Sequence, residues 1–393
     1  MKTTRSSLWL MRFYYLLWTG AGGFLFPFIS LFYSQQGLSG VQMGWLTTIG
    51  SLVALVSAPL IGRLSDRVSN PRRILQLCMA GSAVLIVALG RQTIFGWMAL
   101  IVALEAIIGA PVFPLSDAQA YGISNEKEGF GSIRLWGSLG WAITAFVGGW
   151  MVTRAGLVSI FIGYAVLYLV CIIVLGLIVL PPKKPLPSGE VRVPFRVVLK
   201  SLVSRRVLLG LTIALTLFWL SNNGRYQFET LYMKELGASE QLIGWAYTYP
   251  ALLELPIMLW ADRLVRKYGA GAVLSISLLI EAVALLAIVI FPGIPAILLM
   301  RFLSGLYYSF YAIASVAYAV ENAPEGQGAT ILSLYYVTLN AVIALATAPL
   351  SGMLFDHSGA YPLYIIAAIG TLLAWLALTI SQQKPALIKS GQA

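Results

Sequence analysis

Long apolar runs separated by short polar breaks occupy almost the whole chain. Each run reaches about 18 residues or more, which lets a helix rising 1.5 Å per residue cross ~30 Å of hydrocarbon. The pattern predicts twelve membrane-spanning helices, at about 8–34, 42–63, 74–90, 94–120, 132–153, 157–180, 207–233, 241–262, 271–291, 294–321, 329–353 and 360–381.

The composition agrees with an all-α membrane protein. Charged residues make up 10% of the chain and the mean hydropathy is +0.84, whereas a soluble domain carries about 25% charged residues. The first run is too long for the apolar core of a signal peptide and lacks a small-residue cleavage site, so we expect a retained helix. Two cysteines inside spans and a single histidine in a loop offer no cluster for a metal, a cofactor or an enzyme.

The net charge of +11 is unevenly distributed. Lysine and arginine gather in alternate loops, and the intervening loops carry almost none. This is the positive-inside asymmetry. It places both termini and the central loop in the cytoplasm, predicts a bacterial inner membrane, and argues against nucleic acid as a partner.

One long polar segment, at 181–206, is rich in proline and basic residues, so we expect a cytoplasmic linker between bundles at 1–180 and 207–393. The two halves repeat. The segment 37–45 shares Gly, Ser, Gly and Trp in register with 237–245, and two further matches lie at offsets of 196 to 200 residues. Ser39 and Ser239 are predicted N-caps of spans 2 and 8. Such a repeat is typical of a transporter whose site lies at the midplane between two pseudo-symmetric halves.

The segment Gly62–Arg67, followed by Arg72 and Arg73, resembles the loop after span 2 of the major facilitator superfamily. The resemblance implies the superfamily's fold of two six-helix bundles. It also implies gating roles for Asp66 and Arg67, with Asp262 as a weaker copy in the second half. The alternative is a solvated loop charge that only sets topology.

The segment 128–141 resembles lactose permease and the wider group of sugar, nucleoside and phenylpropionate permeases. Arg134, Ser138 and Trp141 are spaced i, i+4, i+7 and share one helix face. The resemblance implies that Arg134 binds substrate hydroxyls, that Trp141 stacks on the substrate, and that Asp117 pairs with Arg134. We expect this buried cation to face that partner or a cavity, because a lone charge in lipid is costly. A purely structural ion pair is the alternative.

Glu254, between two prolines of span 8, matches a carboxylate that lactose permease uses for its substrate. Burial disfavours a charged carboxyl, so Glu254 is also a candidate proton carrier, together with Glu229 and Glu281. A neutral Glu254 bonded to another helix is the alternative, and Glu105 and Glu281 are either functional or packing residues. Polar stripes on spans 7, 10 and 11 add further candidate substrate contacts: Asn222, Arg225, Tyr308, Tyr311 and Asn340. The spacing also predicts an ion pair between Arg225 and Glu229.

These observations predict a monomeric secondary transporter in the lipid bilayer. We expect proton-coupled symport of a small hydroxylated or aromatic solute such as a sugar, a nucleoside or an aromatic acid. The coupling residues of lactose permease on span 10 are replaced here by Ser304 and Tyr307, so that machinery is not carried over. The alternatives are a multidrug or metabolite efflux antiporter and, from another class, a non-transporting sensor or a membrane-embedded enzyme.

Overall fold

The computed structural model describes residues 5–68, 70–123, 130–179, 201–324 and 327–383. The side chains of Asp66 and Arg67, and residues 181–200 of the expected linker, lie outside this description. The described residues form, in chain order, the helices α1 (Arg5–Leu25), α2 (Ile29–Gln35), α3 (Gly40–Arg67), α4 (Pro71–Leu89), α5 (Phe95–Gly109), α6 (Val112–Ile123), α7 (Phe130–Ala155), α8 (Val158–Leu177), α10 (Arg206–Glu235), α11 (Glu240–Tyr268), α12 (Ala270–Ile290), α13 (Ile294–Asn322), α14 (Gly328–Ser333), the π-helix η1 (Leu334–Leu339), α15 (Asn340–Ser358) and α16 (Tyr361–Gln382).

The prediction of twelve spans in an all-α protein is confirmed within this part of the chain. Eleven helical segments are long and apolar enough to cross a membrane, and the bent helix α11 makes twelve. Both predicted N-caps are also confirmed, since Ser39 accepts from the Gln42 amide and Ser239 accepts from the Leu242 amide.

Four of the spans are interrupted, which the hydrophobic pattern did not predict. The first divides into α1 and α2, the fourth into α5 and α6, and the eleventh contains η1. Helix α11 contains Pro250 and Pro256 and bends by 50° between Met258 and Trp260. Prolines and π-turns remove regular helical hydrogen bonds, and membrane proteins tolerate such breaks where the backbone lines a cavity.

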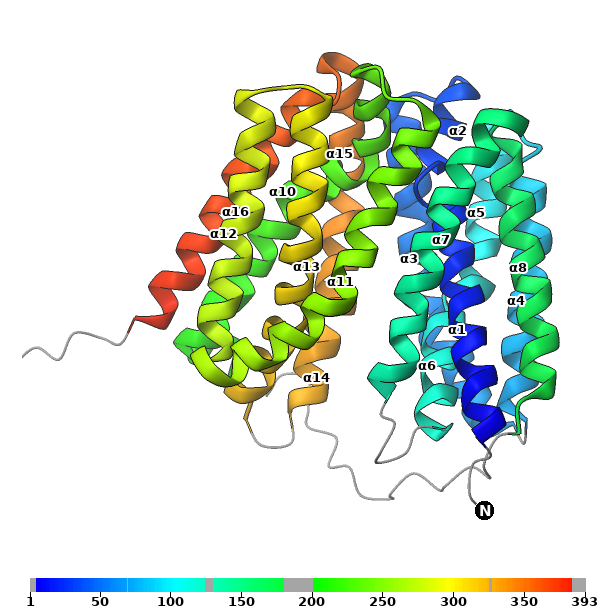
Figure 1. Ribbon diagram of the computed structural model, residues 1–393, viewed down its shortest axis with the longest axis horizontal. Helices are drawn as coiled ribbons and strands as arrows, with labels where there is room; N and C mark the ends of the chain where they lie inside the picture. Colours follow the sequence, from blue (N-terminus) through cyan, green and yellow to red (C-terminus); the bar gives the residue numbers. More distant parts are fainter. Residues whose placement is uncertain (1–4, 69, 124–129, 180–200, 325–326, 384–393) are drawn as a thin grey trace, which may run out of the picture.

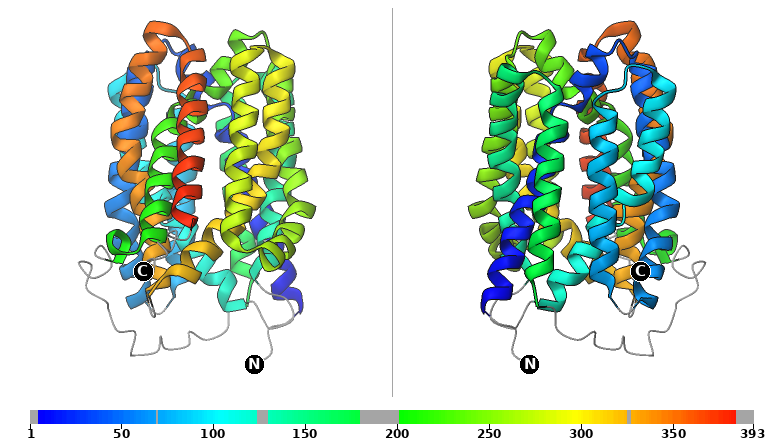
Figure 2. Two further views of the ribbon diagram at one scale, coloured as in Figure 1. Left: turned by 90° about the vertical axis from the view of Figure 1, so that its left-hand side faces the viewer. Right: turned by 90° about the vertical axis from the view of Figure 1, so that its right-hand side faces the viewer.

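Helices α1–α8 form one bundle and α10–α16 form the other (Figure 1). Figures 1 and 2 show that α1 begins and α16 ends at the same end of the molecule, which we name the near end. The opposite end, where α3 and α11 begin and α7 and α15 end, is the far end. The two bundles meet along two helix pairs, α3 with α15 and α7 with α11.

Glycines bring these helix pairs together at the far end, in contacts that we call the far-end seam. A Cβ atom added to Gly40 would lie 2.6 Å from the Gly352 carbonyl oxygen, and one added to Gly244 would lie 2.7 Å from the Ala145 carbonyl oxygen. These positions therefore admit only glycine without separating the helices.

A carboxylate reinforces the seam. Asp356, near the end of α15, accepts from the Gly40 and Val41 amides at 2.5 and 3.0 Å. These amides belong to the unpaired N–H groups at the start of α3, where a negative charge is favourable. Asp356 of one bundle therefore stabilises the helix terminus of the other.

Candidate substrate-binding site

A cavity of about 880 Å³ lies between the bundles. Helices α1, α3, α4, α5, α6, α7 and α8 line it on one side, and α10, α11 and α13 line it on the other. Phe113 and Tyr308 line it and are 53% and 44% exposed. These side chains leave much of their surface uncovered by protein, so the cavity has room for solvent or a ligand, while the seam joins the two bundles at the far end.

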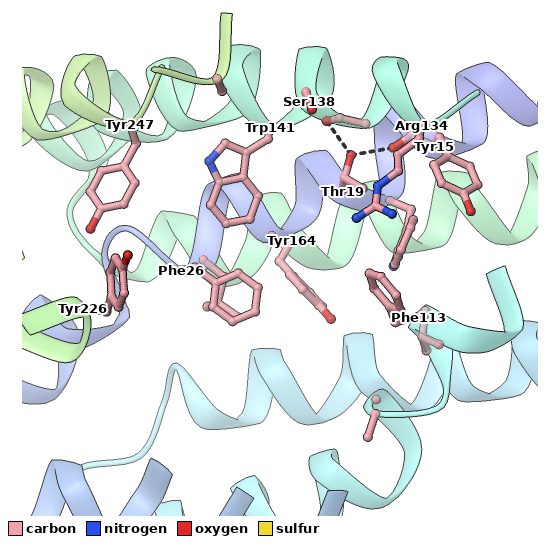
Figure 3. A pocket seen from close by; sticks show the side chains of 18 of the residues that line it. Tyr15, Thr19, Phe26, Phe113, Arg134, Ser138, Trp141, Tyr164, Tyr226 and Tyr247 are labelled. Atoms are coloured by element: carbon pink, nitrogen blue, oxygen red, sulfur yellow. Dashed lines mark hydrogen bonds between the residues drawn. The ribbon is translucent and has the colours of Figure 1, made fainter. Parts of the chain in front are cut away.

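The α7 face predicted from sequence spacing lies on this cavity: Arg134, Ser138 and Trp141 all line it (Figure 3). Glycines decide which face turns inward. A Cβ atom at Gly140 would lie 2.9 Å from the Leu16 Cα and closer still to the Leu16 carbonyl group. The Thr19 hydroxyl reaches the Gly137 carbonyl at 2.7 Å. The glycine face of α7 therefore packs against α1, which leaves the polar face to the cavity.

The expected ion pair between Asp117 and Arg134 is wrong. The nearest partner of Asp117 is Tyr15, whose hydroxyl donates to Oδ1 at 2.6 Å. Arg134 is exposed in the cavity rather than buried, and it lies within electrostatic range of both Asp117 and Glu254 without contacting either. Because water reaches the guanidinium, it does not need a fixed partner, and its donors point to space that a ligand can fill.

Aromatic rings form the part of the cavity beside Trp141. Trp141 stacks on Phe26 with ring centroids 5.8 Å apart and an interplanar angle of 15°. Tyr247 lies beside Trp141 and Tyr226 beside Phe26 (Figure 3), and both tyrosines line the cavity. Sequence analysis missed these three neighbours of Trp141, because an aromatic residue in an apolar span gives no signal of the direction in which it points.

The second bundle contributes Glu254, Arg301, Ser304 and Tyr308 to the wall. Glu254 is half-buried, and no hydrogen bond or ion pair holds it in the described part of the chain. The Arg301 guanidinium lies over the Tyr247 ring, 3.9 Å from its centroid, and the Arg301 Nε donates to the Ala246 carbonyl at 3.0 Å. Arg301 is therefore a fixed cation on the cavity wall.

Behind this wall lies a buried four-charge network. Arg225 binds Glu281 at 2.7 Å and Glu229 at 3.3 Å, which confirms the predicted i, i+4 pair. The other Glu229 oxygen lies 3.0 Å from Arg301, and Ser304 donates to Glu281 at 3.3 Å. Two cations and two anions compensate one another, as charges without water require.

Several candidate substrate contacts lie elsewhere. Asn222 donates to the Thr371 hydroxyl at 2.9 Å, so it joins α10 to α16. Arg225 is 1% exposed inside the network, and Tyr311 is 4% exposed beside Phe218. Their predicted direct contact with substrate is wrong for this conformation, because an inward stripe on a bundle helix meets neighbouring helices before it meets the cavity. Asn340 lines an adjoining cavity of about 660 Å³.

The gating candidates have different outcomes. Asp66 and Arg67 cannot be placed, because their side chains lie outside the described residues. Asp262 is exposed and pairs with Arg266 one turn later on its own helix, and within the described residues no ion pair joins it to the other bundle. The carboxylate that does cap a helix of the other bundle is Asp356, at the far end. Its position at the end of a span was the only signal in the sequence.

Within the described residues, no three His, Cys, Asp or Glu side chains come together in a way that could hold a metal ion. The two cysteines are buried and form no disulfide. The arrangement therefore offers hydrogen-bonding groups and flat rings around an open space.

Comparison with known proteins agrees with this architecture. Residues 8–366 match the MFS_1 like family. The chain is 28% identical over 372 residues to maltose permease of Geobacillus stearothermophilus, covering 94% of this chain and 92% of that protein. It is 25% identical over 318 residues to sugar efflux transporter A of Dickeya chrysanthemi, covering 79% of each. A crystal structure of a mutant of the nucleoside transporter NupG superimposes with a TM-score of 0.82 at 14% identity, covering 96% of this chain and 100% of that one.

Proposed function

The chain belongs to the MFS_1 like family and is a transporter of the major facilitator superfamily rather than an enzyme. From this premise we propose that it carries a small hydroxylated solute by alternating access, with sugars as the first class of candidate substrate. Nucleosides and aromatic acids are the next classes. The observation that carries the proposal is the single face formed by Arg134, Ser138 and Trp141 on a cavity shared with Glu254.

This face suits a sugar for chemical reasons. The Arg134 guanidinium offers five donors in a fixed fork, and Glu254 and Asp117 offer acceptors, so neighbouring hydroxyls of one ring can be held from two sides. The Trp141 ring offers a flat apolar surface for the C–H face of the same ring. Maltose permease is among the relatives, and maltose is therefore the first ligand to test.

Counterflow of maltose into vesicles containing the purified protein tests this assignment, with nucleosides and aromatic acids as parallel ligands. Arg134→Lys keeps the charge but removes the fork, so we expect maltose affinity to fall about tenfold or more. Arg154→Lys is the matched control, because Arg154 lies over the Trp150 ring at the end of α7 and outside the cavity. Wild-type affinity in Arg134→Lys would show that this face does not hold the substrate.

We also propose that transport is symport with protons and that Glu254 carries the proton. This proposal is supported by the position of the Glu254 carboxylate on the cavity wall. The carboxylate lies within electrostatic range of Arg134 and Arg301 but forms an ion pair with neither. In vesicles with an imposed pH gradient, maltose uptake should be accelerated by the gradient. In Glu254→Gln this acceleration should fall clearly below that of the wild type while counterflow, which needs no net proton movement, continues. Uptake that ignores the gradient in the wild type would refute the coupling.

Export by proton antiport is the second candidate. It is favoured by the similarity to sugar efflux transporter A. The direction of maltose movement separates the two candidates. In vesicles whose interior is acidic and whose outer surface carries the near end of the protein, an antiporter accumulates maltose and a symporter expels it.

The positive-inside loops support a cytoplasmic near end in a bacterial plasma membrane. We assign 1–180 and 207–393 as the two rocking bodies of a monomer, joined by 181–206. A cysteine at the exposed Lys234, at the far end of α10, should react with a membrane-impermeant maleimide added to intact cells. Reaction only in inverted vesicles would reverse the assignment.

A further inference from the structure

One carboxylate on the cavity has no role in the substrate face or the four-charge network. Glu105 lies in α5, ten residues after Phe95, or about 15 Å along the helix from the far end. It is half-buried and lines both the main cavity and the adjoining one. Water in either cavity can therefore exchange a proton with it.

The surroundings of Glu105 are polar but uncharged. The Ser82 hydroxyl of α4 donates to its Oε1 at 2.9 Å, and the Tyr164 hydroxyl of α8 lies 3.1 Å from the Ser82 oxygen. Tyr33 of α2 and Tyr168 of α8 are the other titratable groups within electrostatic range. No lysine or arginine of the described chain interacts with this carboxyl group.

The local backbone leaves room for this carboxyl group. A Cβ atom at Gly109 would lie 2.7 Å from the Glu105 carboxyl carbon and closer still to its Oε1. Helix α5 ends at this glycine, before the break that precedes α6. The glycine at i+4 therefore leaves room for the Glu105 side chain to lie along its own helix, toward the helix break.

The charges around the cavity assign a role to this group. In the described chain, Glu229 and Glu281 are matched by Arg225 and Arg301 in the network. Asp117 has Arg134 in range. Glu254 only shares Arg134 and Arg301 with these groups, and Glu105, on the other bundle, has no cation in range. Three arginines therefore face five carboxylates, which leaves two negative charges over. Two uncompensated negative charges near the middle of a membrane are costly, and protons can remove both.

We propose that Glu105 is a second proton-binding carboxylate of the cavity, so that two protons, one on each bundle, accompany each neutral substrate. The second part of this statement rests on the proposed symport. In its protonated form Glu105 becomes a hydrogen-bond donor as well as an acceptor, and the cavity presents no excess negative charge during the crossing.

Infrared spectroscopy of the purified full-length protein tests the proton site without any substrate. The difference spectrum between the wild type and Glu105→Gln isolates the C=O band of the protonated Glu105. We expect this band to lose its intensity between about pH 5 and about pH 9. A band that persists, or is absent, at every pH would show a permanently neutral or permanently charged structural group and overturn the proposal. A loss of the band on adding sodium at constant pH would also overturn it, in favour of a metal cation.

The number of protons per maltose, measured from the two fluxes in vesicles, tests the coupling. We expect the ratio to fall from two in the wild type to one in Glu105→Gln. Glu321→Gln, at an exposed position near the end of α13, should keep the wild-type ratio. An unchanged ratio in Glu105→Gln would overturn the coupling role. If Glu254→Gln alone keeps full coupling, the proposed function of Glu254 fails while the infrared result for Glu105 stands.

Discussion

A methyl group at Gly352 should open the far end of the transporter. In the present conformation, an added Cβ would lie 2.7 Å from the Val41 backbone nitrogen and closer still to the carbonyl group of Gly40. Non-bonded contacts to carbon are optimal at about 3.5–4.0 Å. The clashing atoms belong to the backbone, so a rotamer change cannot relieve the overlap, and α3 must move away from α15.

The size of the effect follows from the cost of overpacking, which is about 1–3 kcal/mol. If this cost applies only to the state with a closed far end, Gly352→Ala raises the population with an open far end by about 5- to 150-fold. The same reasoning predicts slower transport, because the cycle must return through the closed seam.

The assay is the rate at which a cysteine in the seam reacts with a maleimide. Thr48 is 8% exposed and its hydroxyl reaches the Leu345 carbonyl of the other bundle at 3.4 Å, so Thr48→Cys reports opening with little change in volume. The native cysteines are buried. Labelling in the Gly352→Ala background should rise by the factor given above.

Gly96→Ala is the control, because no atom lies within 4 Å of the added carbon. If Gly352→Ala labels no faster than Gly96→Ala, glycine packing does not hold the far end closed, and the reasoning is refuted.

Three further predictions concern other contacts. Asp356→Asn removes the negative charge at the start of α3, which stabilises the closed far end by about 0.3–1 kcal/mol, so the rate of Thr48→Cys labelling should rise about two- to fivefold. No increase would show that the carboxylate does not stabilise the closed end. Glu281→Gln leaves Arg225 short of a buried partner, so the free energy of unfolding should fall by about 3–5 kcal/mol, seen as a lower thermal midpoint in detergent. Glu321→Gln should leave that midpoint unchanged, and an equal midpoint for both variants would mean that the network adds no stability. Trp141→Ala should weaken maltose binding by about 0.5–1.5 kcal/mol, and Trp141→Phe should weaken it less, because only the second variant retains a flat ring. Calorimetry measures both effects, and equal affinities in the wild type and the two variants would exclude stacking.

The cavity face of α7 was predictable from sequence because it depends on local spacing. Arg134, Ser138 and Trp141 share a face in any regular helix, and a polar face in an apolar span has to turn away from lipid. The same reasoning identified the i, i+4 pair of Arg225 and Glu229. It was less successful for Asn222 and Tyr311, whose inward direction is right but whose neighbours are other helices.

The amino-acid sequence by itself determined the number of spans, the repeat of two halves and the helix caps, because hydrophobic length, loop charge and capping chemistry act within a few residues. Only the tertiary structure decided that Asp117 bonds Tyr15, that Arg301 joins Glu229 to the cavity wall, and that Asp356 caps a helix more than 300 residues away. These contacts depend on how helices from distant parts of the chain rotate and approach, and that is set by the close packing of glycines such as Gly140 and Gly352 against backbone. A periodic pattern shows which face turns inward, but the partner of each side chain is determined by the helix that packs against that face.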